Sequence, residues 1–291
     1  MEWDPTQFFR ADDPPTLFAL VVLNQPINEN AFAVLKEHDG GANRYYDLMK
    51  RQGREALDLP SLIIGDLDSI MSDVRSHYTG LGVPVIQDRD QYSTDFTKCL
   101  NYLRSHAHEI VPRESGTQQQ PLNTLILGGL GGRVDQAFSQ IHHLYTMTQE
   151  MQQQQGAAQE QAEEEKKPKE EGNLYLISEE SITFILRPGK NVIHTPGTNR
   201  PLPSPSTSTS TPTPTSEEDH HFLEENVGII PLSGPARITT SGLEWDVTDW
   251  ATSIGGQLST SNHIRADMVE VESRVPVLFT VELAKRFKRT R

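Results

Sequence analysis

The 291-residue sequence predicts an α/β domain with a parallel sheet, followed by a small all-β domain. The first domain is indicated by short apolar runs that alternate with helical stretches and end in glycine and aspartate loops. The second is indicated by the loss of helical periodicity after about residue 180, where short β-rich runs alternate with turn residues. We therefore place the α/β domain at residues 1–178 and the β domain at residues 179–291.

The composition excludes several classes of protein. A single cysteine, Cys99, excludes an internal disulfide framework and fits a reducing compartment. No apolar run is long enough to span a bilayer. The N-terminus lacks the basic start and apolar core of a secretory signal. We expect a cytoplasmic protein with no membrane partner.

The net charge of −14 is unevenly distributed, because residues 149–171 carry −4 and residues 201–226 carry −5. The acidic balance argues against a nucleic-acid partner. Residues 149–171 are rich in Gln, Glu and Lys, and residues 197–219 in Pro, Ser and Thr. Such segments bury too little apolar area to become ordered. We therefore expect disordered inserts at 149–172 and 197–224.

The α/β domain is expected to follow a regular order of elements. The predicted strands are residues 17–23, 61–65, 83–86, 124–129 and 173–178, and the predicted helices lie around 28–37, 45–49, 70–78, 95–107 and 134–145.

One connection in this domain is too short. Only the segment Asn28–His38 separates the turn after the first strand from the loop at Asp39. A parallel crossover needs about a dozen residues or more before the next strand begins. Either the sheet lacks a strand, or this sequence has lost a piece through an incorrect splice prediction.

The β domain is expected to contain five short strands. They are residues 227–232, 236–240, 243–247, 264–272 and 277–282. The polar run at 259–262 is typical of a turn, and Trp245 is typical of a core residue in this setting.

Two acids directly follow the apolar run that ends at Gly65. In an open α/β sheet, ligands bind at the carboxyl ends of the strands. Asp66 and Asp68, spaced by one residue in an extended segment, would point to the same side. Two adjacent carboxylates are costly without a cation between them, and Mg²⁺ prefers such oxygen ligands. The alternative is an ordinary surface turn.

A second acidic segment precedes a helix. Ser93 or Thr94 can cap this helix, whose first turn carries Asp95 and Lys98. The free backbone N–H groups of such a turn suit phosphate. The alternative is a capped surface helix with a solvated ion pair.

The third candidate is the glycine-rich loop at 128–132. Its glycines allow close approach of a ligand to the backbone. Arg133 could fork onto phosphate oxygens, and Asp135 and Gln136 could bind ribose or base. The spacing matches neither a Walker loop nor GxGxxG, so the loop alone is a weak signal. Parallel topology would bring it to the same sheet edge as Asp39, Asp66 and Asp95.

Taken as a set, these motifs resemble those of the thiamine pyrophosphokinase family. The residues that carry the resemblance are LVVLNQPI at 20–27, DGGANR at 39–44, GDLDSI at 65–70, DQYSTDFTKCL at 90–100, GGLGGRVDQ at 128–136, SGLEW at 241–245 and STSN at 259–262. The resemblance implies a Rossmann-like α/β domain, a C-terminal β-sandwich and a homodimer. It also implies transfer of the diphosphate group of ATP to the hydroxyl of thiamine, giving thiamine diphosphate and AMP.

The resemblance also implies roles for individual residues. Asp66, Asp68 and Asp95 would be catalytic and hold Mg²⁺, and either Asp68 or Asp95 would take the hydroxyl proton. The ATP-binding residues would be Asp39, Asn43, Arg44, Lys98, Arg133, Asp135 and Gln136. The thiamine-binding residues would be Gln91, Trp245, Ser261 and Asn262. In the family the tryptophan and the aspartates that meet come from different subunits.

Two features depart from the family pattern. His38 stands where the family has a small residue, and the 28–38 segment omits the second strand of the family. The alternatives to an active enzyme are a homologue that only binds thiamine or ATP, and a metal-dependent phosphohydrolase with an aspartate nucleophile. A third is an adaptor that acts through its low-complexity inserts.

Overall fold

The computed structural model describes residues 1–10, 15, 17–23, 27–35, 42–110, 122–161, 172–201 and 220–289. The chain forms two compact units, here called the α/β unit and the β unit. The α/β unit is Pro15–Glu179, and the β unit combines Met1–Pro14 with Glu180–Arg291. No helix in the described part of the chain combines the length and the hydropathy that a membrane span requires.

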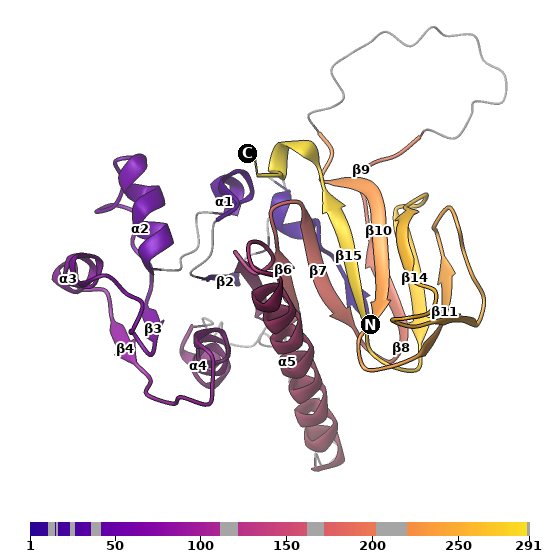
Figure 1. The fold of residues 1–291 in the computed structure, drawn as a ribbon, viewed down its shortest axis with the longest axis horizontal. Helices are drawn as coiled ribbons and strands as arrows, with labels where there is room; N and C mark the ends of the chain where they lie inside the picture. The colour runs from indigo at the N-terminus through magenta and orange to yellow at the C-terminus, as the bar shows by residue number, and fades with distance from the viewer. Residues whose placement is uncertain are drawn as a thin grey trace, which may run out of the picture. The chain divides into compact units, whose positions relative to one another are not determined.

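The α/β unit contains two separate parallel sheets (Figure 1). Its elements are β2 (Phe18–Val22), α1 (Glu29–Leu35), α2 (Ala42–Arg51), β3 (Ile63–Gly65), α3 (Ser72–Gly80), β4 (Val85–Gln87), α4 (Asp95–Ile110), β5 (Asn123–Leu127), α5 (Val134–Gln161) and β6 (Leu174–Ile177).

The larger of these sheets has the strand order β6-β5-β2, with all neighbours parallel. Val22 pairs with Leu127, and Leu127 pairs with Ile177. Continuous apolar runs form these strands because parallel sheets are covered on both faces. Gly129, just beyond β5, has no room for a side chain, because a Cβ there would lie 2.6 Å from Leu176.

Strands β3 and β4 pair only with each other among the described strands. Ile63 is opposite Val85, and Ile64 is opposite Ile86. Between β2 and β3 the described residues hold the helices α1 and α2 and no strand. Helix α1 occupies the short segment between the first strand and the loop at Asp39, and both alternatives from the sequence stay open.

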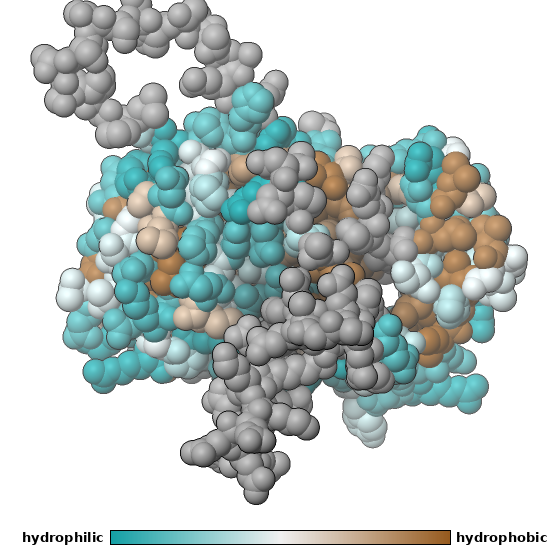
Figure 2. Space-filling view, turned by 180° about the vertical axis from the view of Figure 1, so that it is seen from behind, coloured by the Kyte–Doolittle hydropathy of each residue, from teal (hydrophilic) through white to brown (hydrophobic). Residues whose placement is uncertain are grey.

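Apolar surface accompanies this break in the sheet. Figure 2 shows apolar side chains gathered on the part of the α/β unit that contains α2, α3 and the two short strands. Leu57, Met71 and Leu81 are exposed there, and Ile64 and Ile86 are only half-buried. A parallel strand in a complete sheet buries such side chains on both faces.

Helix α5 extends further than the sequence predicted. It continues to Gln161, so the first thirteen residues of the expected insert at 149–172 are helical, and residues 162–171 lie outside the described residues. Gln, Glu and Met are good helix formers, and Met147 and Met151 are buried. The sequence pattern also places Phe138 on the buried side of this helix with Ala137, Ile141 and Tyr145, but Phe138 is 65% exposed.

The β unit contains two sheets of mostly antiparallel strands (Figure 1). One has the order β13-β10-β15-β7, with β9 beside β10, and the other has the order β1-β8-β14-β11-β12. The strands are β1 (Glu2–Trp3), β7 (Ser181–Leu186), β8 (Gly189–His194), β9 (Thr198–Asn199), β10 (Leu223–Pro231), β11 (Ala236–Ser241), β12 (Trp250–Thr252), β13 (Ser259–His263), β14 (Met268–Ser273) and β15 (Val277–Leu283).

The first fourteen residues belong with the β unit, whereas the sequence analysis placed them in the α/β domain. Strand β1 runs parallel to β8, with Glu2 opposite Val192. The Trp3 ring stacks on Phe184 at 4.9 Å between centroids, and Trp3 Nε1 donates to Asn191 Oδ1 at 3.0 Å. These contacts are far apart in sequence, so no local pattern indicates them.

Two segments of the β unit differ from the predicted pattern. The polar run at 259–262 was expected to be a turn, but it forms most of strand β13, which pairs with β10. Residues 243–247 were expected to be a strand, but they form a loop held by a single β-bridge from Leu243 to Ile264. Pairing with β10 outweighs the turn preference of Ser and Asn.

Candidate active site

Two predicted metal ligands, Asp66 and Asp95, lie at neighbouring ends of a strand and a helix. Asp66 directly follows β3, and Asp95 begins α4. The backbone N–H of Asp66 donates to Asp95 Oδ1 at 2.8 Å, and Lys98 Nζ lies 3.4 Å from the same oxygen. Lys98 is only 3% exposed. The structure therefore brings together Asp66, Asp95 and Lys98, which the sequence separates by about thirty residues.

The segment between Asp66 and Asp68 is not extended, in contrast to the assumption made from the sequence. Leu67 has a φ of 65°, which is unusual for a branched side chain. The chain turns here, and the N–H of Asp68 donates to Asp66 Oδ1 at 2.9 Å. Strained backbone of this kind is concentrated at functional sites.

Gly65 makes this arrangement possible. A Cβ at this position would lie 2.8 Å from the carboxylate carbon of Asp95. We therefore expect Gly65→Ala to displace Asp95 from the Asp66 amide and to lower kcat by about tenfold or more, as positional shifts of catalytic groups do. Steady-state kinetics would measure the effect, with Gly80→Ala as a matched control, because a Cβ at Gly80 meets no atom within 4 Å.

Asn43 connects the DGGANR segment to the aspartate loop. Its Nδ2 donates to the carbonyl of Ser69 at 2.8 Å, and its Oδ1 accepts from the N–H of Met71 at 3.1 Å. Asn43 thus stabilises the loop that carries Asp68. Arg44 is exposed on α2, and Asp39 lies outside the described residues.

The loop before α4 is organised by Asp90. Its carboxylate accepts from Ser93 Oγ at 2.6 Å and from the N–H of Tyr92 at 2.9 Å. The hydrogen bond from Ser93 is the largest effect that lowers the pKa of Asp90. Thr94 caps the helix, as predicted, because its Oγ1 accepts from the N–H of Thr97 at 3.3 Å. Gln91 is exposed beside this loop.

In the glycine-rich loop, two predicted ATP-binding side chains contact each other. Arg133 Nη2 lies 2.5 Å from Asp135 Oδ2, and both side chains are exposed. The hydrogen bond from Arg133 is the main cause that lowers the pKa of Asp135. Exposed ion pairs are weak, so an anionic ligand can displace Asp135 from Arg133. Gln136 is half-buried in the first turn of α5.

Among the described residues, no group of three or more His, Cys, Asp or Glu side chains is arranged to hold a metal ion. The oxygen donors of Asp66, Asp68 and Asp95 nevertheless fit Mg²⁺, which takes one or two carboxylates together with substrate phosphates and water.

Cys99 does not belong to this chemistry. Burial raises the pKa of its thiol to about 12, so the thiol is protonated at neutral pH.

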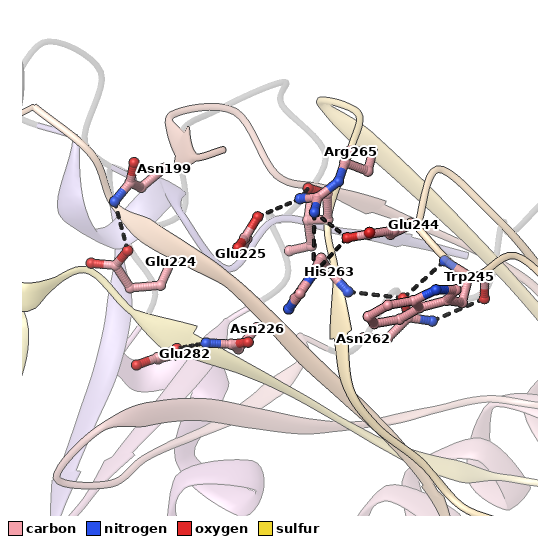
Figure 3. Close-up of polar contacts among 11 residues, drawn as sticks. Asn199, Glu224, Glu225, Asn226, Glu244, Trp245, Asn262, His263, Arg265 and Glu282 are labelled. Atoms are coloured by element: carbon pink, nitrogen blue, oxygen red, sulfur yellow. Dashed lines mark hydrogen bonds and ion pairs between the residues drawn. The ribbon is translucent and has the colours of Figure 1, made fainter. Parts of the chain in front are cut away.

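The fourth predicted group lies in the β unit, where Trp245 is 56% exposed (Figure 3). The sequence pattern favoured a core residue, but the loop at 243–247 presents the indole at the surface. Asp246 holds this loop, because its carboxylate accepts from Thr240 Oγ1 at 3.0 Å and from the N–H groups of Gly242 and Leu243 at 3.0 and 3.1 Å.

Asn262 is buried beneath this loop and contacts its backbone. Its Oδ1 accepts from the N–H of Trp245 at 3.1 Å, and its Nδ2 donates to the carbonyl of Trp245 at 3.0 Å. Ser261, the neighbouring predicted ligand, is exposed and has a φ of 54°. Of the three described non-glycine residues with positive φ, Leu67 and Ser261 fall within predicted ligand-binding motifs, and Asp249 does not.

A separate polar cavity of about 560 Å³ lies in the β unit. Its carboxylates already have partners, since Glu224 accepts from Asn199 Nδ2 at 2.8 Å and Glu282 accepts from Asn226 Nδ2 at 2.5 Å (Figure 3). None of the predicted site residues lines it.

Comparison with known proteins identifies the family. The family model "Thiamin pyrophosphokinase, catalytic domain" matches residues 28–155, and "Thiamin pyrophosphokinase, vitamin B1 binding domain" matches residues 214–278. The chain is 31% identical to thiamine pyrophosphokinase 1 of Arabidopsis thaliana over 93% of this chain and 88% of that protein. It belongs to the thiamine pyrophosphokinase family.

Further relatives of this family agree. Thiamine pyrophosphokinase of Saccharomyces cerevisiae is 26% identical over 91% of this chain and 85% of that protein. The crystal structure of yeast thiamin pyrophosphokinase superposes with a TM-score of 0.71 at 22% identity, covering 97% of this chain and 90% of that one. The Candida albicans structure gives a TM-score of 0.69 at 23% identity, covering 97% and 92%. These structures share the mixed α/β fold.

Sequence reasoning missed three side chains of a connected group, one of which contacts Trp245. They are Glu244, His263 and Arg265, which contact one another (Figure 3). A signal was present in part, because Ser261, His263 and Arg265 follow one another at intervals of two residues, as neighbours on one face of an extended segment do. The turn predicted for 259–262 hid this spacing.

Proposed function

We propose that this member of the thiamine pyrophosphokinase family is an active diphosphotransferase, which transfers the diphosphate group of ATP to thiamine and releases AMP. The observation that carries the proposal is the match of both family models, catalytic and vitamin B1 binding, in one chain that aligns with its relatives over most of its length. The contacts among Asp66, Asp95 and Lys98 support it.

In this proposal the α/β unit binds the triphosphate. Asp66, Asp68 and Asp95 would hold Mg²⁺, which neutralises charge on the phosphate oxygens when bound. Either Asp68 or Asp95 would accept the proton of the attacking hydroxyl. Lys98 and Arg133 would contact phosphate oxygens. The other nucleotide contacts would come from Asp39, Asn43, Arg44, Asp135 and Gln136.

The β unit would bind thiamine. The exposed indole of Trp245 provides a flat surface on which a cationic aromatic molecule can stack. Ser261 and Gln91 are exposed and have polar groups for the aminopyrimidine. Asn262 would support thiamine binding mainly by fixing the backbone of Trp245, and the second N–H of its side-chain amide would be the one to contact the ligand.

The test is the formation of AMP from ATP and Mg²⁺, with and without thiamine. An active diphosphotransferase forms AMP and thiamine diphosphate only when thiamine is added. Release of inorganic phosphate without thiamine would instead favour the phosphohydrolase alternative. Binding of thiamine without turnover would favour a homologue that has lost catalysis.

We also propose that the protein is a cytoplasmic homodimer in which each active site combines Trp245 of one subunit with the aspartates of the other. A closed twofold dimer has two identical sites. At thiamine concentrations far below the KM, where both single variants have little activity, equal amounts of Asp95→Asn and Trp245→Ala subunits, unfolded and refolded together, would then regain about a quarter of wild-type activity, because half of the dimers are mixed and each mixed dimer has one intact site.

Sites built within single subunits would give no such recovery. Size-exclusion chromatography with light scattering provides the independent check, because a monomer at assay concentration would contradict the shared site directly.

A further inference from the structure

A series of polar contacts connects strand β10 to the predicted thiamine-binding tryptophan (Figure 3). Arg265 Nη1 donates to Glu225 Oε2 on β10, and Arg265 Nη2 donates to Glu244 Oε2. The same oxygen of Glu244 lies 2.6 Å from His263 Nδ1. Arg265 therefore lies between two carboxylates, one on the sheet and one on the Trp245 loop.

The series ends on the indole. The rings of His263 and Trp245 lie 5.0 Å apart between centroids, at an angle of 42°. His263 covers part of the indole while 56% of Trp245 stays exposed. Because His263 is fixed through Nδ1 to Glu244, the imidazole cannot turn away from the indole without breaking that hydrogen bond.

We propose that Glu244, His263 and Arg265 are positioning residues for thiamine, which hold the Trp245 side chain in the orientation that stacks on the ligand. This inference rests on the proposed function. The backbone of Trp245 is already fixed by Asn262, so these three residues act on the side chain. A ligand that meets an ordered side chain avoids the entropy cost of ordering it, which strengthens binding.

Arg265 is the residue on which the arrangement depends. Without its charge, Glu225 and Glu244 would repel each other, and Glu244 would lose the contact that orients it toward His263. The side chains of Arg265 and Glu225 are each 29% exposed, and that of Glu244 is 37% exposed. Pairs with this exposure contribute little to stability, so substitutions here should leave the fold intact.

The test compares the kinetics of Arg265→Ala and His263→Ala with those of the wild type. We expect the KM for thiamine to rise about three- to tenfold in each variant, with kcat and the KM for ATP changed less than about twofold. His263→Phe should recover part of the loss seen in His263→Ala, because a flat ring again packs on the indole but has no hydrogen bond to Glu244. If these residues served folding instead, their substitution would change kcat, the KM for thiamine and the KM for ATP together. His263→Phe would then not restore these values.

Two further measurements sharpen the result. The KM for thiamine of the Arg265→Ala/His263→Ala double variant should be no higher than that of the more affected single variant, because both changes break one connected series of contacts. Arg200→Ala is the matched control, since Arg200 is similarly buried and pairs at 2.7 Å with Asp267, which is not a member of this series of contacts. Thiamine binding followed by tryptophan fluorescence provides a readout that does not need turnover.

The possible failures are distinguishable. A wild-type protein that neither binds thiamine nor forms AMP would overturn the proposed function and this inference with it. An active wild type whose Arg265→Ala and His263→Ala variants retain the normal KM for thiamine would overturn the inference alone. Glu244→Gln covers the case in which either alanine variant misfolds, because it keeps the side-chain size and should still raise the KM.

Discussion

Asp95→Asn is expected to lower kcat by about 10²–10³-fold, the usual loss when one charged or hydrogen-bonding group at a reacting centre is removed. Asp95 Oδ1 accepts the N–H of Asp66 at 2.8 Å and lies 3.4 Å from Lys98 Nζ. Asparagine keeps the shape of the side chain and one acceptor, but it removes the charge that would hold Mg²⁺ and balance the buried lysine. AMP formation under saturating ATP and thiamine would measure the loss.

The control for this prediction is Asp73→Asn. Asp73 is an exposed carboxylate in the first turn of α3, as Asp95 is in the first turn of α4, but it does not lie at the end of β3. Its substitution should leave kcat unchanged. If Asp95→Asn folds normally and keeps kcat within about threefold of the wild type, Asp95 does not serve the chemistry that we assign to it.

Trp245→Ala is expected to raise the KM for thiamine by about ten- to thirtyfold and to leave the KM for ATP unchanged. The indole is exposed, and loss of its stacking and cation–π contact with thiamine removes about 1.5–2 kcal/mol, where each 1.4 kcal/mol corresponds to a factor of ten. Trp245→Phe should have a smaller effect, because a phenyl ring still stacks but has a weaker π-face. Steady-state kinetics with each substrate varied in turn would separate these effects.

Ile254→Ala is the control, because Ile254 is an exposed apolar residue of the same unit, 65% accessible to solvent. It should change neither KM. Equal increases in both constants for Trp245→Ala would indicate a general disturbance of the protein rather than the loss of a thiamine contact.

The parts of the fold that could be predicted are those that local pattern determines. The apolar run before Gly65 is a strand, the cap at Thr94 begins α4, and the glycines after β5 form a loop. Each depends on the physical preferences of a few neighbouring residues, such as the hydrogen bond from the Thr97 amide to the Thr94 hydroxyl. The family itself could also be recognised from the order of its motifs.

The parts that could not be predicted depend on contacts between distant segments. Trp3 packs on Phe184, so the N-terminus joins the β unit, and nothing near Trp3 in the sequence indicates this. The residues of β13, Ser259–His263, have the local preferences of a turn, but they are extended because they pair with β10. The same limitation hid Arg265, whose partners Glu225 and Glu244 lie 40 and 21 residues away.

The division of the α/β unit into two sheets has a consequence for how a nucleotide would be held. Asp66 and Asp68 follow β3, and Asp95 begins α4 beside them, whereas the glycine-rich loop follows β5. The sheets of β3 and β5 have no strand pairing in common among the described residues. The two parts are joined instead through helices, since the ring of Phe96 in α4 lies 6.0 Å from that of His143 in α5. A triphosphate held at one end by the aspartates and at the other by the glycine loop would add a second connection between them, so nucleotide binding should raise the local stability of the β3–β4 pair.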